Sequence, residues 1–311
     1  MGNRMTQVPS MNRQDWGILL FLSVIWGGSF FFIEIALDTV QPLTLVLIRV
    51  VLASAMLWLY LLARGERFAV PKGALLAFLV LALLNNVIPF VLFAWAQLAI
   101  EGGLASILNA TTPIWGVIVA HLATADEKAN PGKIVGVLLG FAGVAVMIGA
   151  DLLKDIGTDV LAQLACLAAT LCYAMAGVYA RRFQRMGVSP IGVSTGQLTA
   201  AAIVMLPLVL LFEPPWLGAA PSLSAWLSLS ALALFCTSLA YILYFRLVAS
   251  AGATNSLLVT FLIPITAILL GALILGERLE LRHFAGMALI GAGLAAIDGR
   301  LLARWRPPTP A

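Results

Sequence analysis

Two charged side chains stand inside apolar runs near the start of the chain. Glu34 interrupts IWGGSFFFIEIAL at residues 25–37, and Arg49 interrupts the run at residues 42–63. A charge in hydrocarbon costs several kcal/mol unless it has a partner or water. The short connection at residues 38–41 makes the two runs antiparallel neighbours, so we expect a Glu34–Arg49 pair that faces the interior. Such a pair would serve either as a latch for the hairpin or as a gate or contact for a charged molecule.

Three prolines inside other apolar runs each follow a polar residue by four positions. The pairs are Asn85 and Pro89, Asn109 and Pro113, and Thr260 and Pro264. Proline lacks an N–H, so it frees the carbonyl four residues earlier in a helix and kinks it. In a membrane that carbonyl needs another donor or water. The sequence therefore predicts kinked helices that present polar groups at similar depth.

Further polar and aromatic residues fall at comparable positions in the apolar runs. They are Trp26, Asn86, Trp115, Tyr173, Ser238, Tyr241 and Tyr244. Together with Asn85, Asn109 and Thr260 they predict a wet central cavity that binds a small molecule. The alternative is that the polar side chains only join helices to one another.

Motifs of enzymes and metal sites are sparse. Gly192–Gly196 reads GVSTG and matches the Ser nucleophile motif, but it opens an apolar helix rather than a strand-to-helix turn. An intramembrane serine hydrolase built on Ser194 is thus a competing interpretation, and we expect no catalytic residue. The three cysteines lack metal-ligand spacing and no GxxxxGK occurs. We therefore expect no metal, no cofactor and no ATP site.

The elements that must position these residues are transmembrane helices. Of 311 residues, 62% are hydrophobic and 10% are charged, against roughly 25% charged in an average soluble domain. Runs long enough to cross a bilayer predict an all-α integral membrane protein with ten spans, at about 16–37, 42–63, 73–98, 102–124, 132–150, 158–180, 190–212, 222–246, 252–275 and 283–302.

The basic residues set the expected orientation. Most Lys and Arg, including Arg64, Arg181, Arg182 and Arg185, fall on one side if both termini are cytoplasmic. Because they are scattered between apolar runs, they form no nucleic-acid patch. The expected partners are the lipid bilayer and a small molecule.

The two halves of the chain resemble each other. Residues 105–149 are similar to residues 255–299. The same offset of about 150 residues aligns Pro113 with Pro264, Phe90 with Tyr241, and Phe93 with Tyr244. Two five-helix halves must enter the membrane from opposite sides, and inverted repeats of this kind are typical of transporters with a midplane site. We predict repeats at 16–150 and 158–302.

At these residues the sequence resembles the EamA-type members of the drug/metabolite transporter superfamily. The likeness rests on the ten apolar segments, the run Trp26–Phe30 (WGGSF), the Pro113 and Pro264 helices and the Gly-rich fifth and tenth segments. Within the superfamily the chain is most similar to bacterial amino-acid exporters of the YddG type. One departure concerns the loops after the fourth helix of each half: the second carries Gly276-Glu277, whereas the first carries Ala125-Asp126.

The resemblance implies a secondary transporter in the bacterial inner (plasma) membrane. It would export small metabolites by alternating access around a midplane cavity, with amino acids, including aromatic ones, as the expected cargo. The alternatives are other metabolites or drugs within the same superfamily and, outside it, the serine hydrolase or a passive pore. A pore should show a continuous polar stripe or rings of charge, and the sequence shows neither. The coupling ion, the direction of net flux and the oligomeric state are left open.

Overall fold

The computed structural model describes residues 11–66, 68, 70, 71, 73–125, 127–148, 159–214, 220–270 and 280–298. Within these ranges every regular element is a helix. In the first half the helices are α1 (Arg13–Leu37), α2 (Pro42–Ala63), α3 (Ala74–Ala82), the π-helical turn η1 (Leu83–Val87), α4 (Ile88–Ala96), α5 (Gly102–Asn109), α6 (Thr112–Ala123) and α7 (Pro131–Ile148). In the second half they are α9 (Val160–Arg185), α10 (Pro190–Phe212), α11 (Leu223–Ala233), the π-helical turn η2 (Leu234–Leu239), α12 (Ala240–Ala251), α13 (Ala253–Leu257), α14 (Val259–Leu270) and α15 (Leu281–Asp298).

Seven described helices are long and apolar enough to cross a membrane, and the shorter apolar helices include Pro131–Val146, Ala253–Thr266 and Leu281–Ile297. Each predicted segment overlaps a helix or a run of consecutive helices, although bounds differ by up to five residues. The parts at 149–150, 158, 271–275 and 299–302 lie outside the described residues. Gly276 and Glu277 also lie outside them. Large leucines cover the outer surface: Leu62 is 72% exposed, Leu122 77% and Leu211 73%. Such a surface matches lipid rather than water, so the chain is a multi-pass membrane protein.

Polar groups at the helix ends decide where the helices begin. The side chain of Asn12 accepts from the N–H of Asp15, and the Asp15 carboxylate accepts from the N–H of Asn12, both at 2.9 Å. This capping box satisfies two of the free N–H groups of α1. Asp15 also accepts from Ser250 Oγ at 2.6 Å, which ties the start of α1 to the end of α12.

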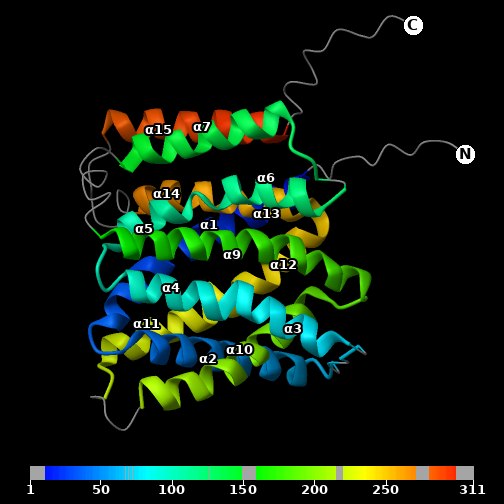
Figure 1. The fold of residues 1–311 in the computed structure, drawn as a ribbon, viewed down its shortest axis with the longest axis vertical. Coiled ribbons are helices and arrows are strands. Elements are labelled where there is room, and N and C mark those ends of the chain that lie inside the picture. Colours follow the sequence, from blue (N-terminus) through cyan, green and yellow to red (C-terminus); the bar gives the residue numbers. More distant parts are fainter. Residues whose placement is uncertain are drawn as a thin grey trace, which may run out of the picture.

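The helices run side by side in layers, and the two halves interlock (Figure 1). Helix α2 packs on α10, and α7 packs on α15 at one edge of the molecule. Helix α4 packs on α9, and α1 packs on α11, α12 and α14. The contacts are thus symmetric between the halves. The second helices pack on each other, as do the fifth helices, and the first helix of each half packs on the third helix of the other. The π-helical turns η1 and η2 also occupy matching places, each in the middle of the third helix of its half.

Glycines let α7 and α15 approach closely. A Cβ added to Gly136 would lie 2.5 Å from the carbonyl oxygen of Gly293, and a Cβ on Gly293 would lie 2.5 Å from that of Gly136. Carbon and oxygen atoms do not approach that closely, so only glycine fits at either position. At Gly291, on the same helix as Gly293, no atom lies within 4 Å of an added Cβ.

We predict that Gly136→Ala and Gly293→Ala each lower the thermal midpoint of the detergent-purified protein, because overpacking costs about 1–3 kcal/mol. Gly291→Ala is the matched control and should leave the midpoint unchanged or raise it, since alanine favours a helix by up to about 1 kcal/mol. Equal midpoints for all three variants would mean that the α7–α15 contact is not set by these glycines.

Candidate functional site

A cavity lies among helices of both halves. The space open to the centre of a water molecule is about 90 Å³. One water needs about 10–15 Å³ of such space, so the cavity has room for several. The walls come from α1, α2, α4, α5, α6, α9, α12, α13 and α14, and include residues of η1. The lining residues are Trp26, Ser29, Phe30, Ile33, Arg49, Asn85, Phe90, Phe93, Asn109, Thr112, Tyr173, Tyr241, Tyr244, Leu257, Val259, Thr260 and Ile263.

Seven of the 17 described lining residues are aromatic, and several of their rings contact one another. The ring centroids of Trp26 and Tyr244 lie 5.6 Å apart. Phe93 contacts Phe30 edge-on at 5.7 Å and stacks on Tyr173 at 6.1 Å. Because each ring is held by another, the wall is stiff and offers flat apolar surface to a bound molecule.

Tyr241 joins the third helices of the two halves. Its hydroxyl donates to the backbone carbonyl of Asn85 at 2.9 Å and accepts from Asn86 Nδ2 at 3.0 Å. The Asn85 carbonyl needs this donor because residue 89 is a proline and has no N–H to offer it. The Asn85 amide donates in turn to Gln197 Oε1 at 3.1 Å. A hydrogen-bonded chain thus runs from α12 through η1 to α10.

The other two predicted prolines differ in their surroundings. Between α5 and α6 the freed carbonyl of Asn109 accepts from Thr112 Oγ1 at 2.6 Å, and Pro113 lies in the first turn of α6. Pro264 lies inside α14, where Thr260 donates to the carbonyl of Leu257 at 2.9 Å. At Pro113 a neighbour in sequence satisfies the freed carbonyl, and at Pro89 the donor comes from the other half of the chain.

Seven of the predicted binding residues line the cavity, and three do not. The seven are Trp26, Asn85, Asn109, Tyr173, Tyr241, Tyr244 and Thr260. Asn86 lies behind Tyr241 and holds its hydroxyl. Ser238 donates to the carbonyls of Ala233 and Ala53, so it joins helices. Trp115 is half-buried on α6 and outside the lining.

Glu34 and Arg49 are not brought together. Arg49 is 4% exposed, and its Nε donates to Thr237 Oγ1 at 2.8 Å. Glu34 is exposed and points past Gly102, where an added Cβ would lie 3.2 Å from Glu34 Oε2. In the described part of the chain the two charges form no ion pair, so the expected pairing is wrong. The two residues sit on facing helices, but only Arg49 turns inward.

Several wall residues were missed by inspection of polar positions alone. Phe90 and Phe93 were the clearest of them, because the repeat aligns them with Tyr241 and Tyr244. Phe30, Ile33 and Ile263 gave no such signal, since an apolar residue in an apolar helix looks the same whether it faces lipid or a cavity.

Ser194 does not form a catalytic triad with the described histidines. Its hydroxyl donates to the carbonyl of Pro190 at 2.9 Å, within α10. His121 Nδ1 accepts from the N–H of Ala129, and His283 Nδ1 accepts from the N–H of Glu280. Each of these side chains is therefore engaged with backbone close to it in sequence.

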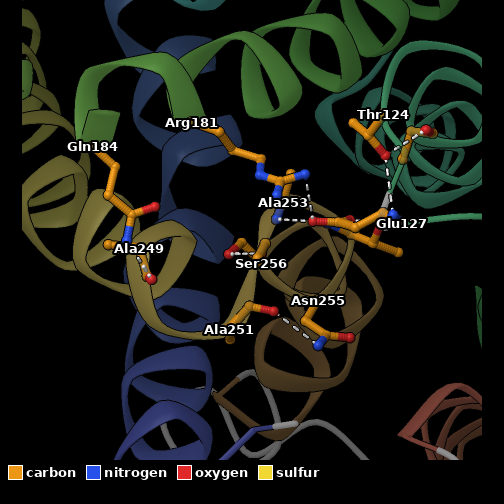
Figure 2. A network of polar contacts seen from close by, with 12 residues as sticks. Thr124, Glu127, Arg181, Gln184, Ala249, Ala251, Ala253, Asn255 and Ser256 are labelled. Carbon is orange, nitrogen blue, oxygen red and sulfur yellow. Dashed lines mark hydrogen bonds and ion pairs between the residues drawn. The ribbon is translucent and has the colours of Figure 1, made fainter. Parts of the chain in front are cut away.

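A carboxylate from the first half holds the start of a second-half helix. Figure 2 shows Glu127, in the loop after α6, between Arg181 of α9 and Ala253 of α13. Its carboxylate accepts from the N–H groups of Ala253 at 3.2 Å and Thr254 at 3.1 Å, and also from the Thr254 hydroxyl. Arg181 Nη1 lies 3.3 Å from Glu127 Oε1. The Glu127 side chain is 3% exposed and the Arg181 side chain 21%, so this contact between the halves is largely shielded from water.

A second carboxylate makes the reciprocal contact. Glu213, at the end of α10, accepts from the N–H groups of Leu43 at 3.0 Å and Thr44 at 2.7 Å, in the first turn of α2. An acidic side chain is favourable at a helix N-terminus because it meets free N–H groups and the positive end of the helix dipole. Each half thus caps one helix of the other.

Comparison with known proteins gives one family. The family model described as "EamA-like transporter family" matches residues 15–149 and again residues 160–297. A Bacillus subtilis (strain 168) protein named "Uncharacterized transporter YoaV" is 22% identical over 281 residues, covering 89% of this chain and 94% of that protein.

Two Escherichia coli (strain K12) proteins are also similar. One, named "Uncharacterized inner membrane transporter YedA", is 25% identical and covers 88% of this chain and 87% of its own. The other, named "Probable amino-acid metabolite efflux pump", is 25% identical and covers 91% and 94%. A solved structure with a TM-score of 0.74 and 22% identity covers 94% of this chain and 99% of that chain, which shows a shared fold.

We predict that Tyr241→Phe lowers the thermal midpoint and Tyr244→Phe does not. The first substitution leaves the Asn85 carbonyl and the Asn86 amide without partners, at about 1–3 kcal/mol for a buried polar group. The Tyr244 hydroxyl makes no hydrogen bond to the described residues, so Tyr244→Phe is the matched control. A Tyr241→Phe protein as stable as the control would show that water replaces the lost hydroxyl.

We predict that Glu127→Gln lowers the thermal midpoint and raises the labelling rate of Cys introduced at Thr254, because a neutral amide with one oxygen replaces a carboxylate that accepts from Ala253, Thr254 and Arg181. Removing one partner of a fully buried pair costs about 3–5 kcal/mol, and we expect a smaller loss here because the Arg181 side chain is 21% exposed. Glu280→Gln is the control, since its pair with Arg282 is exposed and such pairs contribute about 0–1 kcal/mol. Thr254→Cys itself removes a hydroxyl contact. The labelling rate is therefore compared between the Thr254→Cys protein and the double variant that also carries Glu127→Gln. Equal effects of Glu127→Gln and Glu280→Gln would contradict a role for Glu127 in holding the start of α13.

Proposed function

Because the chain belongs to the EamA-like transporter family, we propose that it is a secondary transporter that exports small metabolites, amino acids including aromatic ones among them. The protein is a multi-pass protein of the bacterial inner membrane. The observation that carries the substrate proposal is the cavity, whose wall combines aromatic rings with the amides of Asn85 and Asn109. Rings hold an apolar side chain without fixed direction, and amides offer donors and acceptors to a polar backbone.

The topology belongs to the same proposal. Ten membrane spans form two inverted five-helix repeats, at 16–150 and 158–302, with both termini in the cytoplasm. The exchange of helix contacts between the halves supports this arrangement, as do the matching positions of η1 and η2. Inverted repeats allow one set of helices to rock against the other around a fixed site.

The caps at Glu127 and Glu213 support alternating access. In the proposed topology Glu127 lies at the cytoplasmic end and Glu213 at the outer end. Each carboxylate joins the two halves, so rocking open at one end must release one cap. The π-helical turns, whose hydrogen bonding is already irregular, are places where the third helices can bend. The roles of Pro89, Pro113 and Pro264 as kinks belong to the same proposal, and so does a gating role for Glu34 and Arg49 without a direct pair.

The relative named as an amino-acid metabolite efflux pump supports the choice of amino acids over other cargo. Other metabolites and drugs of similar size are the second candidate, because an aromatic wall also accepts a planar drug. The two differ in what competes for the site.

Counterflow in proteoliposomes tests the proposal with a panel of amino acids, sugars and drugs. We expect saturable counterflow of phenylalanine, competed by other amino acids and not by sugars. Trp26→Ala should weaken phenylalanine transport about tenfold, or ~1.4 kcal/mol, and threonine transport less, since it removes apolar contact. Trp26→Phe is the control, because it keeps a ring but loses the hydrogen bond to Cys236.

Equal losses for phenylalanine and threonine would remove Trp26 from the side-chain pocket. Competition by drugs alone would replace amino acids with the second candidate. Failure of every compound to exchange would overturn the transport proposal for this panel.

A further inference from the structure

The one charged side chain among the described lining residues of the cavity is a cation. Arg49 lies on α2, is 4% exposed, and forms no ion pair within the described part of the chain. Holding a guanidinium inside a membrane protein without a counter-charge is costly. A ligand with a negative charge would offset this cost whenever it is bound.

The surroundings of Arg49 fix its orientation. Nε donates to Thr237 Oγ1 at 2.8 Å, and the Thr237 hydroxyl donates onward to the carbonyl of Leu232 at 2.7 Å. The guanidinium carbon lies over the face of the Phe90 ring, 3.7 Å from its centroid, which is a cation–π contact. The ring and the hydroxyl together hold the plane and the Nε edge of the guanidinium.

The rest of the guanidinium is free. Nη1 and Nη2 have no hydrogen-bond partner among the described residues, and Arg49 is one of the residues that line the cavity. Two parallel N–H donors on one edge of a guanidinium match the two oxygens of a carboxylate. A lysine could supply the charge in this place but not the fork.

The cavity has no matching anchor for an ammonium group. None of its described lining residues is Asp or Glu, and Glu34 is exposed and not among them. An amine would be left with neutral oxygens and ring faces, while the Arg49 charge repels it. The electrostatics of the site therefore favour an anion and make an amino group optional.

Building on the proposed transport function, we propose that Arg49 binds the carboxylate of the substrate, and that the cargo is a small carboxylate on an apolar body for which an α-amino group is dispensable. Thr237 is then a positioning residue, since it acts through the Nε of Arg49. The aromatic wall of Trp26, Phe93 and Tyr244 receives the apolar body.

Direct binding to the purified full-length protein in nanodiscs, measured by calorimetry, tests this with matched ligands. They are phenylalanine, 3-phenylpropionate, which lacks the amine, and 2-phenylethylamine, which lacks the carboxylate. We expect 3-phenylpropionate to bind within about tenfold of phenylalanine, and 2-phenylethylamine to bind more weakly than both. Comparable or tighter binding of 2-phenylethylamine by the wild-type protein would overturn the proposal, and this comparison needs no variant.

Substitutions at Arg49 supply the second test. Arg49→Gln should weaken binding of both carboxylates by about tenfold to a hundredfold, the range for a hydrogen bond to a charged group, and leave 2-phenylethylamine unchanged or improved. Arg49→Lys should restore part of the affinity, whereas a purely structural role would give one common loss for all three ligands. Thr237→Val, which removes only the Nε partner, should have a smaller effect than Arg49→Gln with the same preference for carboxylates. Wild-type affinity for 3-phenylpropionate in folded Arg49→Gln would refute the assignment.

Counterflow with the same ligands separates this inference from the proposed function. Binding of carboxylates without any exchange would overturn transport and keep the role of Arg49. Exchange of the amine and the carboxylates at equal rates would keep transport and overturn the role of Arg49. If neither carboxylate binds at concentrations up to ~10 mM, which would still detect a Kd of ~1 mM, the role of Arg49 is overturned as well.

Discussion

The need of backbone N–H and carbonyl groups for hydrogen-bond partners inside a membrane shapes this structure. Pro89 frees the carbonyl of Asn85, and the hydroxyl of Tyr241 from the other half occupies it. The donor that this carbonyl has thus comes from the opposite half of the chain. The bond therefore joins the two halves where the third helix of each carries a π-helical turn, and it places Tyr241, together with Asn85, in the wall of the cavity.

The same requirement accounts for the ends of the helices. A helix leaves its first N–H groups without partners, and in this protein two of the partners are carboxylates from the opposite half, Glu213 on α2 and Glu127 on α13. Each contact is at once a helix cap and a joint between the halves. The molecule is held together at its middle by hydrogen bonds to irregular backbone, and near its ends by charges on helix termini.

Charge is distributed unequally between the ends and the centre. At the ends, Glu127 finds both N–H groups and Arg181. At the centre, the partners of Arg49 among the described residues are a hydroxyl and a ring face. The first arrangement is complete and needs no further molecule, whereas the second leaves donors open to a cavity. Glu127 has all its partners within the protein and holds the structure, whereas Arg49 still has N–H groups that can bind a ligand.

Length and hydropathy in the sequence were enough to predict the helical segments, because spanning a bilayer imposes a run of about 20 apolar residues. Prolines and the internal repeat located Asn85, Tyr241 and Tyr244, because a missing N–H and a shared offset are visible in one dimension. Side-chain direction was not visible. Glu34 and Arg49 looked like partners because their helices are neighbours, yet rotation of α1 and α2 about their axes turns one outward and the other into the cavity. That rotation is set by packing against α10, α11 and α14, helices far away in the sequence, so only the tertiary structure decided it.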